Sequence, residues 1–428
     1  MDVSEGEHAS YSPQLMNDLI RNYANESKDI AFYLCQNKSD VNVLRDLYCG
    51  DFPVKHQRAV ELFVWAAFSG LIAVALVGNA TVMWIIAHCK TMHNSFNLML
   101  FNIALADFLI ALLNVGTTWT FNFYFDWWYG DYFCPLNHFF GVAPTSASVF
   151  TMMVVSHDRQ TSTHSFFSCA AIVDPLGKRA MSRKRACFLI VLIWMFAGLL
   201  SFPNFVNARV EPKYSYSSLT GVLSKHRICS NDFHYKFLYD NTLFVVQYAI
   251  PLLVLTYTYV RILLAFRNIK FPSASRVTIS RNHMRDKRKA IKMLGFVVII
   301  FMVSWLPYQL YHILSDFFMK NALVGVYTYL VFYFLAMTAS AVNPLIYFCF
   351  NHRFRLGFKY VFRFFPFVNF ANCDHNEMFG DLSRSAMLSV RMRQVQGPTP
   401  GSPLHPKSSS PTHNRPHSPT SATSLTLN

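Results

Sequence analysis

Charged side chains are scarce in this sequence. Only 14% of its 428 residues are Asp, Glu, Lys or Arg, whereas 53% are hydrophobic and 16% are aromatic. A soluble domain usually contains about 25% charged residues, so this composition favours a membrane protein with polar ends. The net charge is +15, but the basic residues gather beside apolar stretches. We therefore expect membrane lipids and a cytoplasmic protein as partners, and no nucleic acid.

Signals of catalysis are also lacking. The sequence has no Ser-His-Asp spacing, no metal-ligand cluster and no glycine-rich phosphate loop, so we predict no enzyme. It shows no internal repeat, a feature of many transporters, although a seven-span transporter remains an alternative. The acidic and polar residues 1–10 do not resemble a cleavable signal peptide, so we expect the first span to direct membrane insertion.

Long apolar stretches dominate what is present. Each is long enough to cross about 30 Å of hydrocarbon as a helix of roughly 20 residues. These stretches are residues 62–88, 97–121, 133–157, 186–206, 238–266, 290–313 and 326–350. The sequence therefore predicts an all-α membrane protein, a seven-transmembrane-helix bundle with a short amphipathic eighth helix and disordered termini.

The chain divides into four predicted parts. We expect an N-terminal segment at 1–58, the seven-helix domain at 59–351, the amphipathic helix at 352–366 and a disordered tail at 367–428. The tail is dense in Ser, Thr and Pro and cannot bury enough apolar surface to fold. It is either a solvated tail or a docking strip controlled by phosphorylation.

Orientation follows from the basic loops. Lys and Arg cluster at residues 178–185, 267–289 and 353–363, on one side of the predicted bundle, although the loop between the fourth and fifth stretches is also basic. This bias predicts that the clustered side is cytoplasmic and the N-terminus extracellular, as in a multi-pass plasma-membrane protein. Asn25 and Asn37 are then glycosylation acceptors on the outer side.

Several cysteines fit this orientation. Cys134 and Cys229 both fall on the extracellular side, where disulfides persist, and a bridge between them would hold the intervening loop over the bundle mouth. Cys35 and Cys49 share that compartment and form a second candidate pair. Cys373 follows the amphipathic stretch and is a candidate acylation site.

Asp107 lies near the middle of the second stretch. An isolated charge at that depth costs a few kcal/mol, roughly 3 on insertion scales, so we expect it to face the bundle interior. Ser148, Asn343 and Asn79 lie at comparable depths, and a sodium ion with water would complete the cluster. The alternative is a protonated carboxyl group that only holds helices together. We expect no other cofactor and no other metal.

Three of the stretches contain a proline near bulky aromatic side chains. Pro251, Pro307 and Pro344 each remove a backbone hydrogen bond and weaken their helix, which makes these helices hinge candidates. Trp305 precedes Pro307 by about half a turn, and Tyr259 lies two turns beyond Pro251. The pattern favours helices that move.

Together, motifs in all seven stretches resemble the rhodopsin-like class of G-protein-coupled receptors. They are Gly78-Asn79, Asp107, Trp128-Tyr129-Gly130, Asp158-Arg159, Trp194, Pro251, Trp305-Leu306-Pro307-Tyr308 and Asn343-Pro344-Leu345-Ile346-Tyr347. Within that class, two further runs, together with Trp305-Leu306-Pro307-Tyr308, are similar to tachykinin-type neuropeptide receptors. The two runs are Arg353-Phe354-Arg355-Leu356-Gly357-Phe358-Lys359 and Ala147-Ser148-Val149-Phe150-Thr151.

The resemblance implies functions for individual residues. It implies a sodium pocket at Asp107, Ser148 and Asn343. It also implies a ligand for the outer side, a heterotrimeric G protein on the inner side, and receptor kinases and arrestin acting on the tail. The implied activation switch comprises Asp158, Arg159, Tyr259, Phe301, Trp305, Pro307, Asn343, Pro344 and Tyr347.

The residues themselves favour a peptide ligand. An amine receptor needs a carboxylate deep in the third span and a retinal protein needs a seventh-span lysine, and residues 138–155 and 326–350 contain neither. The upper bundle instead offers neutral polar and aromatic side chains, which suit an amidated peptide end: Asn114, His138, Asn204, Gln309, His312 and Tyr333. The resemblance places Asn114, Gln309, His312 and Tyr333 in the ligand pocket.

One segment departs from the family pattern. After Asp158-Arg159 the pattern expects a tyrosine and a short run into Ala-Ile-Val-x-Pro-Leu, but residues 160–169 intervene here. We expect this insertion to replace a firm loop with a polar one and to endanger G-protein coupling. Three explanations are an alternative or mistaken splice junction, an isoform with impaired coupling, and full tolerance. We predict that most expressed transcripts lack residues 160–169.

Overall fold

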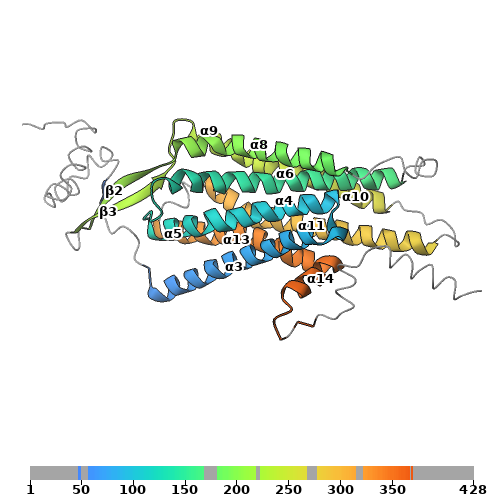
Figure 1. Ribbon diagram of the computed structural model, residues 1–428. Helices are drawn as coiled ribbons and strands as arrows, with labels where there is room; N and C mark the ends of the chain where they lie inside the picture. The colour runs from blue at the N-terminus through green and yellow to red at the C-terminus, as the bar shows by residue number, and fades with distance from the viewer. Residues whose placement is uncertain are drawn as a thin grey trace, which may run out of the picture. The chain divides into compact units, whose positions relative to one another are not determined.

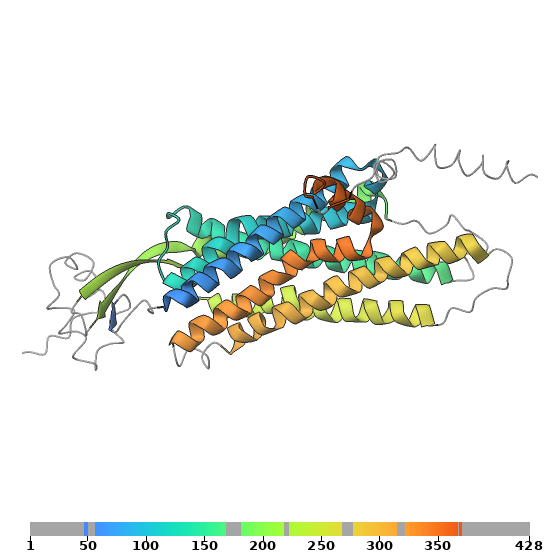
Figure 2. The ribbon, with the colours of Figure 1, turned by 90° about the horizontal axis from the view of Figure 1, so that it is seen from below.

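The structure is a computed structural model that describes residues 47–49, 56–167, 181–217, 222–267, 277–314, 322–366 and 368–369. Within these residues, seven helical segments are long and apolar enough to cross a membrane, as the sequence predicts. Figures 1 and 2 show that the axes of these long helices are roughly aligned with one another. Asn25, Asn37, Cys35, Cys373 and the predicted tail, apart from residues 368–369, lie outside the described residues.

Each predicted span corresponds to a helix or to a pair of helices joined by a π-helical turn. The first, third, fourth, sixth and seventh spans are α3 (Arg58–His88), α6 (Phe133–Phe167), α8 (Arg183–Asn207), α11 (Val277–Ile313) and α13 (Ala322–Phe350). The second span is α4 (Ser95–Ile110), the π turn η3 (Ala111–Val115) and α5 (Gly116–Tyr124), and the fifth is α9 (Lys236–Phe244), the π turn η4 (Val245–Ala249) and α10 (Ile250–Arg267).

Two helices extend beyond their predicted cytoplasmic ends. Helix α11 begins at Val277 and not at residue 290, because hydropathy detects the membrane and not the helix itself. Helix α6 continues to Phe167, so the expectation of a polar loop is wrong for residues 160–167 of the insertion. That stretch contains neither Gly nor Pro to end the helix. Residues 168 and 169 lie outside the described residues.

The predicted amphipathic helix is shorter than expected. Helix α14 (His352–Val361) is followed by turns up to residue 366. The Asn351 side chain caps its first turn by accepting a hydrogen bond from the Arg353 amide. Phe354, Leu356 and Phe358 are buried and belong to the apolar core that α14 shares with the membrane helices.

The helices close into a bundle because α3 packs against both α4 and α13, while α6 contacts α4, α8, α10 and α11. A continuous apolar core, which includes Ile103, Trp119 and Tyr347, joins residues of the membrane helices with residues of α14. Gly78 permits a close approach of α3 and α13, since a Cβ atom there would lie 2.9 Å from the Pro344 ring. The asparagine-proline segment of α13 therefore packs directly on the first helix.

A small sheet lies beyond one end of the bundle (Figure 1). Its order is β1-β2-β3, with β1 (Leu47–Cys49) parallel to β2 (Arg209–Ser217) and β2 antiparallel to β3 (Val222–Ser230). The predicted bridge between Cys134 and Cys229 is present and ties β3 to the start of α6. The proposed Cys35 and Cys49 pair cannot be described because Cys35 lies outside the described residues.

Candidate functional site

The Asp107 carboxylate lies at the meeting point of three helices. One carboxylate oxygen, Oδ1, accepts hydrogen bonds from the hydroxyls of Ser148 (3.5 Å) and Ser340 (3.2 Å). The other, Oδ2, accepts a 2.6 Å hydrogen bond from the Asn343 amide nitrogen. Asp107 on α4 is 4% exposed, so these contacts replace the water it would otherwise bind. The structure thus brings together Asp107, Ser148 and Asn343, as the sequence predicts.

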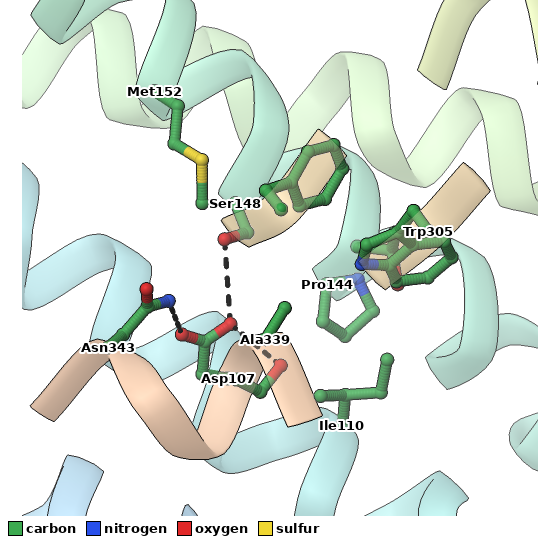
Figure 3. A pocket seen from close by; sticks show the side chains of 11 residues that line it. Asp107, Ile110, Pro144, Ser148, Met152, Trp305, Ala339 and Asn343 are labelled. Atoms are coloured by element: carbon green, nitrogen blue, oxygen red, sulfur yellow. Dashed lines mark hydrogen bonds between the residues drawn. The ribbon is translucent and has the colours of Figure 1, made fainter. Parts of the chain in front are cut away.

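A small cavity adjoins this carboxylate. Figure 3 shows Asp107 between Ser148 and Asn343, with Pro144 and Trp305 on another side of the cavity. The cavity measures about 10 Å³, close to the volume that one water molecule needs. Because Phe301 and Trp305 come from α11, four helices, α4, α6, α11 and α13, share the lining.

The groups around the cavity suit a small hard cation. A carboxylate and two hydroxyls supply oxygen atoms, the donor type that hard cations prefer, whereas Asn343 presents its amide nitrogen to the carboxylate. Asp107 also supplies the negative charge that a monovalent ion would balance. The residues therefore fit the sodium ion expected from the sequence.

Asn79 takes a different position from the one expected. Its amide nitrogen donates to the carbonyl oxygens of Ala75 (2.8 Å) and Ser340 (3.1 Å), and it makes no direct hydrogen bond to Asp107 within the described residues. Ser340 takes the place expected for Asn79. It lies one helical turn before Asn343, so the three-residue spacing in the sequence could have identified it.

The aromatic residues of the predicted switch on α10 and α11 are closely packed. The Phe301 and Trp305 rings lie 5.6 Å apart, and both residues precede Pro307 in the C-terminal part of α11. The Tyr259 ring of α10 lies against the backbone of Gly295 on α11, where any Cβ atom would overlap its hydroxyl. The absence of a Cβ atom at Gly295 therefore makes room for the Tyr259 ring, which would have to move if residue 295 carried a side chain.

The remaining switch residues lie toward the end of the bundle opposite the sheet. The Arg159 guanidinium carbon lies 4.0 Å from the centre of the Phe96 ring, a contact that the sequence did not predict. Asp158 precedes Arg159 on α6 and is half-buried, and pairing between the two stays a prediction. The Tyr347 ring is fully buried and lies 5.5 Å from the Phe354 ring of α14.

The upper bundle contains a second polar cluster. Asn114 lies in the π-helical turn η3, donates to Asn137 Oδ1 (3.0 Å) and accepts a 3.0 Å hydrogen bond from the Tyr333 hydroxyl. Thr117 also donates to Asn137 Oδ1, at 2.5 Å. The structure thus joins two predicted ligand residues, Asn114 and Tyr333, by a direct hydrogen bond. The cluster as a whole draws on η3, α5, α6 and α13. Asn137, three residues after Cys134, was missed because no sequence pattern distinguished it from its neighbours.

The other two predicted ligand residues lie on α11. Gln309 is buried and His312 is exposed. Tyr308 lies between His312 and Tyr333, and its ring centre is 4.6 Å from that of His312 and 5.9 Å from that of Tyr333. The Tyr308 ring therefore connects His312 with Tyr333, and the Tyr333 hydroxyl connects to Asn114, while Gln309 lies three residues before His312 on the same helix.

Comparison with known proteins agrees with this architecture. The family described as 7 transmembrane receptor (rhodopsin family) matches residues 78–347. The chain is 42% identical to the probable G-protein coupled receptor tkr-1 of Caenorhabditis elegans, over 84% of this chain and 87% of the relative. It is 32% identical to the human substance-P receptor over 80% and 79% of the two chains, and 31% identical to the neuromedin-K receptor of Cavia porcellus over 74% and 68%.

The chain therefore belongs to the rhodopsin family of seven-transmembrane receptors. Its relatives within that family include tachykinin-type receptors, as the sequence motifs indicated. It is a multi-pass membrane protein, and membership in this family favours a receptor over the seven-span transporter.

Proposed function

We propose that this protein is a plasma-membrane receptor for an extracellular neuropeptide of tachykinin type and that it signals through a heterotrimeric G protein. The observation that carries the proposal is the similarity to receptors named for substance P and neuromedin K over most of the chain. The polar region formed by Asn114, Gln309, His312 and Tyr333 supports it, because neutral hydrogen-bonding groups suit an amidated peptide end.

The proposed orientation places the N-terminus and the β2–β3 hairpin outside the cell. The Cys134–Cys229 bridge supports this orientation, since disulfides persist in oxidising compartments. The tail then faces the cytoplasm, where receptor kinases and arrestin act on it. The partners on the two sides are a peptide and a G protein, with membrane lipids around the bundle.

Signalling follows from coupling the outer region to the inner ends of the helices. Peptide bound near His312 and Tyr333 favours a state in which α11 swings outward at Pro307, with Trp305 and Phe301 repacking beside the Asp107 cavity. Sodium held by Asp107, Ser148 and Asn343 favours the resting state. A peptide must bind the active state more tightly by about 5.5 kcal/mol to move the equilibrium from 1:99 to 99:1.

The insertion weakens coupling in the chain as given. Residues 160–167 continue α6 by more than two helical turns beyond Arg159. In the sequence, this stretch separates Arg159 from the Ala-Ile-Val-x-Pro-Leu run that follows it closely in the family pattern. We propose that this extension displaces Ile172, Pro175 and Leu176 from their contact with the G protein. The form without residues 160–169 is then the efficiently coupled receptor.

A calcium-release screen tests both proposals. Cells express either the full chain or a chain in which one tyrosine replaces residues 160–169, and each receives substance P, neuromedin K and a panel of other C-terminally amidated peptides. We expect a response from the shortened chain and a weaker or absent one from the full chain.

Binding of labelled peptide to the same cells separates coupling from recognition. Equal binding with unequal calcium release supports the proposed effect of the insertion. Equal calcium release by both forms would show that the insertion is tolerated. Absence of both binding and release for every peptide, with both chains at the cell surface, would contradict the tachykinin-type ligand.

A further inference from the structure

A groove of about 490 Å³ lies between α6 and α10 and shares no lining residue with the Asp107 cavity. Both helices run toward the proposed cytoplasmic side, and the groove lies in the last few turns of their membrane spans. Its lining residues are His157, Gln160, Leu253, Val254, Tyr257 and Thr258.

The α10 side of the groove changes character along the helix. Leu253, Tyr257 and Arg261 follow one another at four-residue spacing and so share one helix face. Leu253 is 70% exposed and Tyr257 is 58% exposed. The guanidinium carbon of Arg261 lies 6.0 Å from the Tyr257 ring centre. From the bilayer interior toward the cytoplasm, the face is therefore apolar, then amphipathic, then cationic.

The α6 side adds hydrogen-bonding groups at the polar end. His157 is exposed and Gln160 is half-buried, and they lie within five residues of Thr161, where the span ends. Gln160 is also the first residue of the insertion, at the position where the family pattern has an aromatic side chain. This chain therefore places an amide in the groove, and Arg261 lies one helical turn beyond the lining residue Tyr257.

We propose that this groove binds one anionic phospholipid of the cytoplasmic leaflet. An acyl chain covers Leu253 and Val254, and the phosphate lies among Gln160, His157 and Arg261. A soluble anion would leave the apolar wall uncovered, and a neutral sterol would leave the cationic end unpaired. The gradient from apolar to cationic matches the chemistry of a lipid from tail to headgroup. The inference rests on the proposed orientation of the bundle.

Native mass spectrometry of the purified full chain tests this site. The protein is incubated in mild detergent with phosphatidylserine or with phosphatidylcholine of matched acyl chains, and the lipid retained per chain is counted. We expect one phosphatidylserine to be retained in preference to phosphatidylcholine. Arg261→Gln should lower that retention about fivefold, the factor expected for one basic residue near an anionic membrane surface. Gln160→Leu should lower retention without changing charge.

Lys292→Gln is the matched control. Lys292 is an exposed cation near the cytoplasmic end of the α11 span and does not line the groove. Its substitution removes the same charge and should leave phosphatidylserine retention unchanged. Equal retention of the two lipids by the parent chain, or an equal loss in the Lys292 and Arg261 variants, would overturn the proposal. Calcium release is not read, so either result leaves the proposed receptor function intact.

Discussion

Asp107 shows how a single buried carboxylate can link the helices of a receptor. Its two oxygens accept hydrogen bonds from α6 and α13, while the residue itself belongs to α4. Each of these bonds offsets part of the cost of burying the charge, and removal of one partner would leave an unpaired polar group in an apolar region. The carboxylate therefore links α4 to α6 and α13, and the proposed sodium ion would act on this link.

Gly78 offers a direct test of packing at the asparagine-proline segment. Gly78→Ala would place a methyl group 2.9 Å from the rigid Pro344 ring, so α3 and α13 must separate. We expect overpacking to cost about 1–3 kcal/mol, seen as a lower melting temperature of the purified receptor. Gly70→Ala on the same helix is the control, because nothing lies within 4 Å of its added methyl group. Equal melting temperatures for the two variants would contradict this packing.

Tyr333 tests the ligand region. Tyr333→Phe removes the hydroxyl that donates to Asn114 and leaves the ring in place. Loss of one neutral hydrogen bond is worth about 0.5–1.5 kcal/mol, so we expect peptide affinity to fall by a few-fold up to about tenfold. The change should be measured by competition binding. Tyr132→Phe, at a tyrosine that is 94% exposed, should have no effect. Unchanged affinity in the Tyr333 variant would exclude this hydroxyl from recognition.

Single residues also show the limits of prediction from sequence. Asp107, Ser148 and Asn343 were identified because polar groups are rare and costly in membrane spans. The contact between Arg159 and Phe96 was not, because no periodicity indicates which aromatic ring a guanidinium from another helix will meet. Asn114 meets Tyr333 through a π-helical turn, and the sequence carries no reliable signal for such turns.

At the scale of elements, hydropathy located all seven spans but not the full extent of their helices. Helices α6 and α11 continue into polar sequence, where hydropathy no longer reports secondary structure. The β2–β3 hairpin was treated only as a loop before the fifth span. Its two strands lie beyond one end of the bundle, and each is nine residues long. The predicted disulfide then fixes β3 to α6.

The disulfide provides a test of that element. Cys134→Ser combined with Cys229→Ser releases the hairpin from α6 across a sequence separation of 95 residues. We expect a stability loss of about 2–5 kcal/mol, the usual range for removal of a native disulfide, together with weaker peptide binding. Cys187→Ser is the control, since that cysteine is free and exposed on α8. A double variant that melts and binds like the control would show that the hairpin needs no such anchor.

At the scale of the whole molecule, the two polar regions belong to one bundle whose helices connect them. Helices α6, α11 and α13 each contribute residues both to the Asp107 cavity and to the region of Asn114 and His312. A peptide that repositions α11 from outside therefore alters the surroundings of Asp107. Binding free energies are reciprocal, so sodium that stabilises the resting state must weaken agonist binding by the same coupling.

Sodium dependence of agonist affinity is the most direct test of this coupling. Peptide competition is measured on membranes that carry the shortened chain, with sodium chloride or choline chloride at equal ionic strength. The account predicts that sodium weakens agonist affinity in the parent and that this difference disappears in both Asp107→Ala and Asn343→Ala. A sodium effect that persists undiminished in both variants, or that is absent from the parent, would contradict it.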